Sequence, residues 1–178
     1  KDAHIPKIAT VVSGLHTTDD ARFLRMFWEI HYKGSENDWK PFAKGGDFSR
    51  YYNDLAYRVR WGQNGQPIKD LVMEKYSYLS SYTWVVANES SYFKEGLTYP
   101  ATSEKGIGAQ YLPTGSIPSK KGKGIVLESD GHLWHLLGLL NSSVLEALLK
   151  VFTVDREHQV SMIGSLPFAA PKAEPNLN

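Results

Sequence analysis

WKPFAKGGDFSRYYNDLAYRVRW, residues Trp39–Trp61, brings aromatic side chains, cations and a pair of glycines together in one short segment. Its last part, Leu55–Trp61, alternates apolar and basic positions, which is typical of a strand with one face in the core. The basic positions, Arg58 and Arg60, then lie on the outer face. The segment therefore predicts a half-buried strand whose exposed side is positively charged.

The glycine pair, Gly45 and Gly46, predicts a sharp turn whose backbone lies close to a ligand, because neither residue has a Cβ atom. Backbone amides in such turns form concavities that bind anions. Arginine, short hydroxyl side chains and backbone amides also supply most contacts to DNA phosphates. We therefore expect phosphate contacts from Lys44, Gly45, Gly46, Ser49 and Arg50. The alternative is an ordinary connecting loop, with its aromatic side chains in the core and its cations in solvent.

Further stretches accompany this segment along the chain: GLHTTDDARFLRMFWEI (14–30), YFKEGLTYP (92–100), Gly115-Ser116-Ile117, LLGLLNSSV (136–144) and IGSLPF (163–168). Together with WKPFAKGG (39–46), YY (51–52) and VRWGQNG (59–65), this order resembles the carboxy-terminal DNA-recognition region of TaqI-like adenine-specific DNA methyltransferases. The likeness is greatest to the large enzymes of restriction–modification and phage-defence systems, such as BREX and phage growth limitation. It covers residues 8–168.

The resemblance implies a target-recognition domain that grips double-stranded DNA and reads a short site for a separate catalytic domain. The methyltransferase active site needs an Asn-Pro-Pro-Tyr type loop and a glycine-rich motif for S-adenosylmethionine, and this sequence has neither. We therefore expect no catalytic residue, metal or cofactor in this chain, which is not an enzyme on its own. The resemblance places S-adenosylmethionine in an N-terminal methyltransferase domain of a longer parent protein, and it implies a cytoplasmic location.

Side chains around the end of the predicted strand are candidates for reading bases. Arginine pairs with guanine, and Gln and Asn pair with adenine, in the major groove, which admits a β-ribbon. We expect DNA contacts from Arg58, Arg60, Gln63 and Asn64, on a hairpin whose turn is GQNG (62–65). Alternatively, Asn64 serves only the turn, since Asn-Gly is a common turn dipeptide. The DNA-binding hypothesis also requires that Lys44, Arg50 and Arg58 share one positive face.

Other lysines lie outside this segment, on predicted loops and on one predicted strand. Mobile lysines suit non-specific attraction to DNA, or they serve solubility alone. Lys94 falls on the predicted strand Tyr92–Tyr99, where it either faces DNA or pairs with Glu95. The loop lysines expected to attract DNA are Lys105, Lys120, Lys121 and Lys123.

The remaining pattern predicts a single α+β domain: a twisted, mostly antiparallel sheet with a few helices packed on one side. The sequence PTGSIPSKKGKG (Pro113–Gly124) predicts an exposed mobile loop. Residues 1–7 are expected to be a lead-in, and 169–178 a disordered tail or linker. The expected strands are Ile8–Val12, Arg25–Tyr32, Leu55–Trp61, Tyr92–Tyr99, Ile107–Leu112, Ile125–Glu128 and Val160–Leu166, and the expected helices are Asp20–Leu24, Ile68–Leu79, Leu133–Leu140 and one that ends at Phe152.

Composition limits the functions that the chain can have. Of 178 residues, 42% are hydrophobic and 22% charged, the net charge is +1, and there is no cysteine. Disulfides and thiolate metal sites are therefore excluded. No apolar run is long enough to cross a membrane. Any DNA-binding surface must be a local patch, because the chain as a whole is nearly neutral.

Two other functions remain open. The 5 Trp and 10 Tyr also suit a carbohydrate-binding module. The string Asp38-Trp39-Lys40 is similar to part of a magnesium-dependent nuclease site. His132 and His135, three residues apart, have no evident third ligand for zinc.

Overall fold

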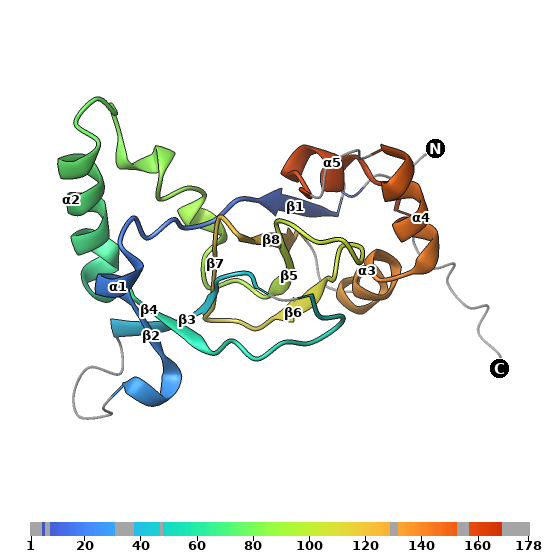
Figure 1. The fold of residues 1–178 in the computed structure, drawn as a ribbon, viewed down its shortest axis with the longest axis horizontal. Coiled ribbons are helices and arrows are strands. Elements are labelled where there is room, and N and C mark those ends of the chain that lie inside the picture. Colours follow the sequence, from blue (N-terminus) through green and yellow to red (C-terminus); the bar gives the residue numbers. More distant parts are fainter. Residues whose placement is uncertain are drawn as a thin grey trace.

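Two sheets form the framework of the protein, as Figure 1 shows. A computed structural model describes residues 5, 8–30, 38–46, 48–128, 132–152 and 157–168. Each sheet has four strands, and most neighbouring strands run antiparallel. The predicted α+β class is confirmed, with the strands divided between two sheets. Of the predicted lead-in and tail, only Ile5 lies within the described residues, and it is buried.

The first sheet has the strand order β1-β8-β5-β6 and packs against three helices. Its strands are β1 (Ala9–Val12), β5 (Gly96–Pro100), β6 (Gln110–Leu112) and β8 (Gly122–Leu127), and every pairing is antiparallel. The helices α3 (Leu133–Leu140), α4 (Ser143–Phe152) and α5 (Val160–Ser165) gather at one end of the molecule in Figure 1. Leu97 and Ile125 of the sheet pack with Leu136 of α3 in one core.

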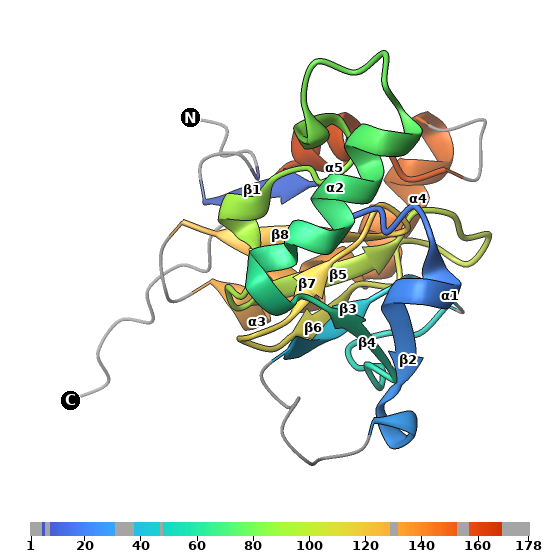
Figure 2. The ribbon, with the colours of Figure 1, turned by 90° about the vertical axis from the view of Figure 1, so that its left-hand side faces the viewer.

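The second sheet has the order β2-β4-β3-β7 and packs against α2 (Gln66–Lys75). Its strands are β2 (Leu24–Met26), β3 (Trp39–Ala43), β4 (Tyr57–Arg60) and β7 (Ile117–Pro118). Val59 of β4 is fully buried in a second core with Ile68 and Val72 of α2, whereas Arg60 is exposed. The predicted half-buried strand with a basic outer face is confirmed. In Figure 2, α2 stands in front of the strands.

Capping side chains fix the starts of two helices. The Asp19 carboxylate accepts a hydrogen bond of 3.0 Å from the Arg22 amide at the start of α1 (Asp20–Phe23). The Ser142 hydroxyl accepts one of 3.3 Å from the Leu145 amide at the start of α4. Short turns among the described residues are η2 (Phe27–Glu29), η5 (Tyr82–Trp84), η6 (Glu89–Ser91) and η4 (Gly62–Gly65), in which Gln63 and Asn64 have positive φ. No helix in the described ranges is long and apolar enough to span a bilayer.

Several predicted elements are shorter than expected. The strand predicted at Arg25–Tyr32 ends at Met26, because the Glu29 carboxylate accepts the Met26 amide hydrogen bond at 2.7 Å and starts η2; residues 31 and 32 lie outside the described ranges. Strands β5 and β6 begin four and three residues later than predicted, since Phe93, Gly106 and Gly108 all have positive φ. The helix predicted to reach Leu79 ends at Lys75.

Three predictions about element type are wrong. The segment Val160–Leu166 is mainly the helix α5, because Ile163 and Leu166, three residues apart, both reach the core. The GQNG turn leads through η4 into α2 rather than into a second hairpin strand. The segment Pro113–Gly124 is not an exposed loop: it contains β7 and the start of β8, whose glycines permit close backbone packing.

Candidate nucleic-acid interface

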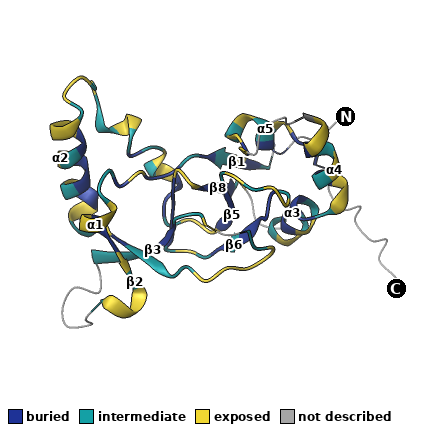
Figure 3. Cartoon of the chain, viewed as in Figure 1, coloured by how far each residue is buried: buried dark blue, intermediate teal, exposed yellow. Residues whose placement is uncertain are grey.

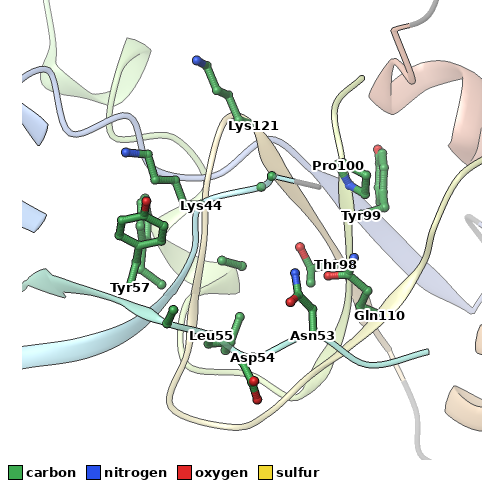
Figure 4. A pocket seen from close by; sticks show the side chains of 15 residues that line it. Lys44, Asn53, Asp54, Leu55, Tyr57, Thr98, Tyr99, Pro100, Gln110 and Lys121 are labelled. Atoms are coloured by element: carbon green, nitrogen blue, oxygen red, sulfur yellow. The ribbon is translucent and has the colours of Figure 1, made fainter. Parts of the chain in front are cut away.

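Two adjoining clefts open where residues of the two sheets meet. The first has a volume of about 500 Å³ and lies between the end of β3, residues 53–57 and strands β5 and β6, as Figure 4 shows. The second has a volume of about 820 Å³ and is lined by residues 15–18, 100–102 and 119–121. A set of residues lines both clefts and is called the shared rim: Phe42, Lys44, Gly46, Pro100 and Lys121.

The glycine turn after β3 shapes this rim in two ways. Gly45 has a φ of +78°, and a Cβ atom placed on it would lie 2.4 Å from the Lys121 carbonyl oxygen. The close approach that the absent Cβ atom permits is therefore to the protein's own backbone at Lys121. Gly46 has a φ of +153°, and a Cβ atom on it would meet nothing within 4 Å. Gly46 thus leaves open space beside the clefts.

Lys44 stands on the shared rim between a carboxylate and an aromatic ring. Its ammonium lies 2.8 Å from an Asp20 carboxylate oxygen and 4.8 Å from the centre of the Tyr57 ring. Burial opposes ionisation of Asp20, but hydrogen bonds from Lys44 and Thr17 outweigh it and lower the pKa of the carboxyl. Because the side chains are 29% and 54% exposed, the ion pair adds little stability, and Lys44 remains accessible to an anion.

Lys120 and Lys121 give the rim an exposed cationic edge at the connection between β7 and β8. The Ser119 hydroxyl accepts hydrogen bonds from the Lys121 amide at 3.2 Å and the Gly122 amide at 2.7 Å, which fixes this connection. Nearby, partial burial and then the charge of Lys120 lower the pKa of His16, which lines the second cleft. Burial is the largest cause of this lowered pKa, and the lysine charges add to it while Asp20 opposes it.

The floor of the first cleft carries amide and hydroxyl groups. The Gln110 amide donates to the Ser49 carbonyl at 3.1 Å, and the Thr98 hydroxyl donates to the Lys123 carbonyl at 3.0 Å. Asn53 is exposed and makes no side-chain hydrogen bond to the described residues; Figure 4 shows its amide beside the cleft. Sequence reasoning missed Asn53, Gln110 and His16, because only distant segments make them neighbours of the lysines.

The predicted DNA-contacting residues do not form one site. Lys44, Gly45, Gly46 and Lys121 line the first cleft, and Lys120 lines the second. Arg50 instead pairs with Glu146 of α4 at 3.1 Å. Arg58 lies on the opposite face of β4 from Tyr57, the residue whose ring Lys44 covers. Lys44, Arg50 and Arg58 therefore share no common positive face, and the interface that the sequence predicts from these three residues is wrong. Any DNA surface on the described residues has to be formed instead by the lysines that line the clefts.

The other predicted residues lie outside both clefts. Lys123 is buried: its ammonium donates to the His158 carbonyl at 2.7 Å and lies 3.4 Å from the Glu157 carboxylate. Residues 122–126 of β8 are all buried, so the lysine that the sequence predicts on a loop is a buried residue of a strand. Lys94 precedes β5 instead of lying on a strand. The rest of the predicted set away from the clefts is Ser49, Arg60, Gln63, Asn64 and Lys105.

The described residues contain no group of three His, Cys, Asp or Glu side chains that could hold a metal ion. His132 and His135 pack edge-on against the Phe168 ring, with centroids 5.5 and 5.6 Å away. The Asp38 carbonyl accepts a hydrogen bond from the Trp61 amide, which places the Asp38-Trp39-Lys40 string at the start of β3.

The sequence is similar to part of a much longer protein. It is 24% identical to the adenine-specific methyltransferase PglX of Lacticaseibacillus casei (strain Zhang) over 176 residues, which cover 93% of this chain and 14% of that protein. No family model matches the sequence. The chain thus spans about one seventh of the length of this relative.

Proposed function

We propose that the chain is the DNA-recognition module of an adenine-specific DNA methyltransferase of a phage-defence or restriction–modification system. It grips double-stranded DNA for an N-terminal catalytic domain that binds S-adenosylmethionine, in the cytoplasm. One observation carries the proposal: Lys44, Lys120 and Lys121 line adjoining clefts in a chain similar along nearly its whole length to part of a methyltransferase. The module itself supplies no catalytic group.

The clefts suit the DNA backbone because cations and hydrogen-bond donors converge there. Lys44 and Lys121 line both clefts, Lys120 stands beside them, and Ser119 holds their connection. Each lysine that neutralises a phosphate releases condensed counterions, so that binding weakens as salt rises. With a net charge of only +1 the chain has no general attraction for DNA. The proposed binding therefore depends on this local patch.

Amide side chains in the first cleft are the proposed contacts to DNA bases. Asn53 is exposed there without a hydrogen-bond partner in the described residues, and an Asn amide pairs bidentately with adenine in the major groove. Gln110 is less available, because its amide already donates to the Ser49 carbonyl. We propose that Asn53 contributes to sequence preference, whereas the lysines contribute to affinity for any duplex.

The test measures duplex DNA binding by fluorescence anisotropy at several salt concentrations. Replacing Lys44, Lys120 and Lys121 together by Ala should reduce the slope of log affinity against log salt by about 2.7, since each lost phosphate contact contributes about 0.9. A matched variant that replaces Lys94, Lys105 and Lys150 removes the same charge outside the clefts and should change the slope much less. Equal losses in the two variants would show that the clefts are not the binding site.

A further inference from the structure

Three arginines lie on the outer face of the second sheet, where the Arg25 and Arg58 guanidiniums donate hydrogen bonds to nearby backbone carbonyls. Arg25 on β2 lies directly opposite Arg58 on β4, and Arg60 follows two residues later on the same face. Like charges opposite each other in a sheet are destabilising. Within the described ranges, none of the three forms an ion pair with a carboxylate. This face is therefore complementary to an anionic partner.

Two exposed aromatic rings stand beside these arginines. Phe27 and Trp28 of η2 are 44% and 64% exposed, and their rings meet edge to face with centroids 4.9 Å apart. The Arg58 guanidinium lies 5.8 Å from the centre of the Phe27 ring. Figure 1 shows this turn directly after β2 at the edge of the molecule, and Figure 3 shows it as exposed. We call Phe27 and Trp28 the aromatic tip.

Hydrogen bonds hold the aromatic tip next to the first cleft. The Phe27 amide donates to the Ala56 carbonyl at 2.9 Å, and Ala56 lines that cleft. The Glu29 carboxylate accepts from the Met26 amide at 2.7 Å, so the acidic group of this turn is engaged with the backbone. The aromatic tip is therefore attached to a residue of the first cleft, whereas Arg58 and Arg60 beside it alternate along β4 with Tyr57, whose ring contacts Lys44.

We propose that the aromatic tip stacks on a nucleobase exposed by local opening of the duplex, while Arg25, Arg58 and Arg60 contact the neighbouring phosphates. This inference rests on the proposed DNA-binding function. Aromatic side chains stack on bases of any sequence, and a guanidinium beside the ring adds attraction to both base and phosphate. Trp28 presents the larger ring, and Phe27 supports it edge-on. A protein partner would also cover exposed rings, but the arginines favour a polyanion.

The test compares binding to two duplexes that both contain 2-aminopurine and differ at one neighbouring base pair. This pair is matched in one duplex and mismatched in the other. The whole chain should bind the mismatched duplex about tenfold more tightly, within the range that base–aromatic stacking supplies. The 2-aminopurine emission should fall on binding, because stacking quenches it. Anisotropy on the same samples reports affinity independently of the emission change.

Trp28→Ala should abolish both the tenfold preference and the quenching. The matched control is Trp84→Ala, which removes a 74% exposed tryptophan on η5 that lines neither cleft and should leave both signals intact. Trp28→Phe keeps an aromatic ring and should retain part of the preference, which separates stacking from a general loss of structure. Urea unfolding of each variant checks that the fold is unchanged.

The outcomes separate this inference from the proposed function. Salt-dependent binding that is equally tight for the two duplexes would overturn the stacking proposal and leave DNA binding in place. No binding to either duplex would overturn both. A Trp28→Ala variant that keeps the mismatch preference but no longer associates with the catalytic domain would also overturn the proposal, and would identify the tip as a protein interface.

Discussion

The backbones of Gly45 and Gly122 lie in direct contact: a Cβ atom on Gly122 would lie 2.5 Å from the Gly45 nitrogen, and one on Gly45 would lie 2.9 Å from the Gly122 nitrogen. This contact joins the end of β3 in the second sheet to the start of β8 in the first. It also fixes the separation of Lys44 and Lys121, which precede the two glycines in sequence, on the shared rim. A tight contact between glycines therefore sets the geometry of the proposed interface.

Gly122→Ala should destabilise the protein. The new Cβ atom would lie 2.2 Å from the Ala43 carbonyl oxygen, and because that atom is backbone, the two sheets must shift apart. We expect the free energy of unfolding, measured with urea, to fall by about 1–3 kcal/mol. Gly138→Ala is the matched control: a Cβ atom there meets nothing within 4 Å, and in helix α3 it should raise stability by about 0.5–1 kcal/mol. Unchanged stability of Gly122→Ala would contradict the contact.

Replacement by Met should have different effects at Lys121 and Lys123, although they are only two residues apart: one should change DNA binding and the other stability. Lys123→Met leaves the buried His158 carbonyl without its donor, so we expect the free energy of unfolding to fall by about 1–3 kcal/mol. Lys121→Met changes an exposed side chain and should alter stability by less than about 0.5 kcal/mol, while it weakens DNA binding. Urea unfolding and anisotropy measure the two effects. If Lys123→Met weakens DNA binding but leaves the free energy of unfolding unchanged, Lys123 is not the buried structural residue described above.

Asp20→Asn should strengthen DNA binding. The substitution removes a negative charge from the second cleft and releases Lys44 from its ion pair at 2.8 Å. We expect affinity at low salt to rise about fivefold, which corresponds to a near-surface charge interaction of about 1 kcal/mol. The gain should shrink at high salt through screening. Asp70→Asn on α2, outside both clefts, should leave affinity unchanged, and an equal gain in both variants would indicate a general charge effect.

Acidification between pH 7 and pH 5 should destabilise the protein through His158. Burial, with a contribution from the Lys123 charge, lowers the pKa of this histidine despite its hydrogen bond to the Gly106 carbonyl. In the unfolded chain, His158 has the ordinary histidine pKa of about 6.5. Below that pH the unfolded chain therefore binds a proton at His158 that the folded chain does not. The contribution of neutral His158 to the free energy of unfolding is fully present above that pH. Below it, the free energy of unfolding falls by up to about 1.4 kcal/mol per pH unit.

His158→Gln should flatten this pH dependence, as measured by urea unfolding across the same range. His16→Gln is the comparison, because the pKa of His16 is also lowered but His16 is less buried than His158, so that it should contribute less. Carboxyl groups such as Asp20, whose pKa is lowered, act only at more acidic pH. A His158→Gln variant with the same pH profile as the parent would assign the effect to other groups.

The local sequence was sufficient to predict several helices and strands and some of the residues that line the clefts. The helix Leu133–Leu140 was predicted with the bounds that it has. The alternation of β4 correctly assigned Val59 to the core and Arg60 to the surface. These features depend on interactions among residues a few positions apart, so that a short window of sequence contains their cause.

The three-dimensional arrangement was needed to sort the cations. Lys121 and Lys123 belong to the same glycine-rich stretch, yet one is exposed on the rim and the other is buried against His158. Arg50 forms an ion pair with Glu146, 96 residues away in the chain, instead of lying on a common face with Lys44. Such outcomes depend on which distant segments pack together, here through the contact of Gly45 with Gly122. Composition and spacing alone do not contain that information, because the two glycines are distant in the chain and nothing in the local sequence of either one identifies the other as its partner.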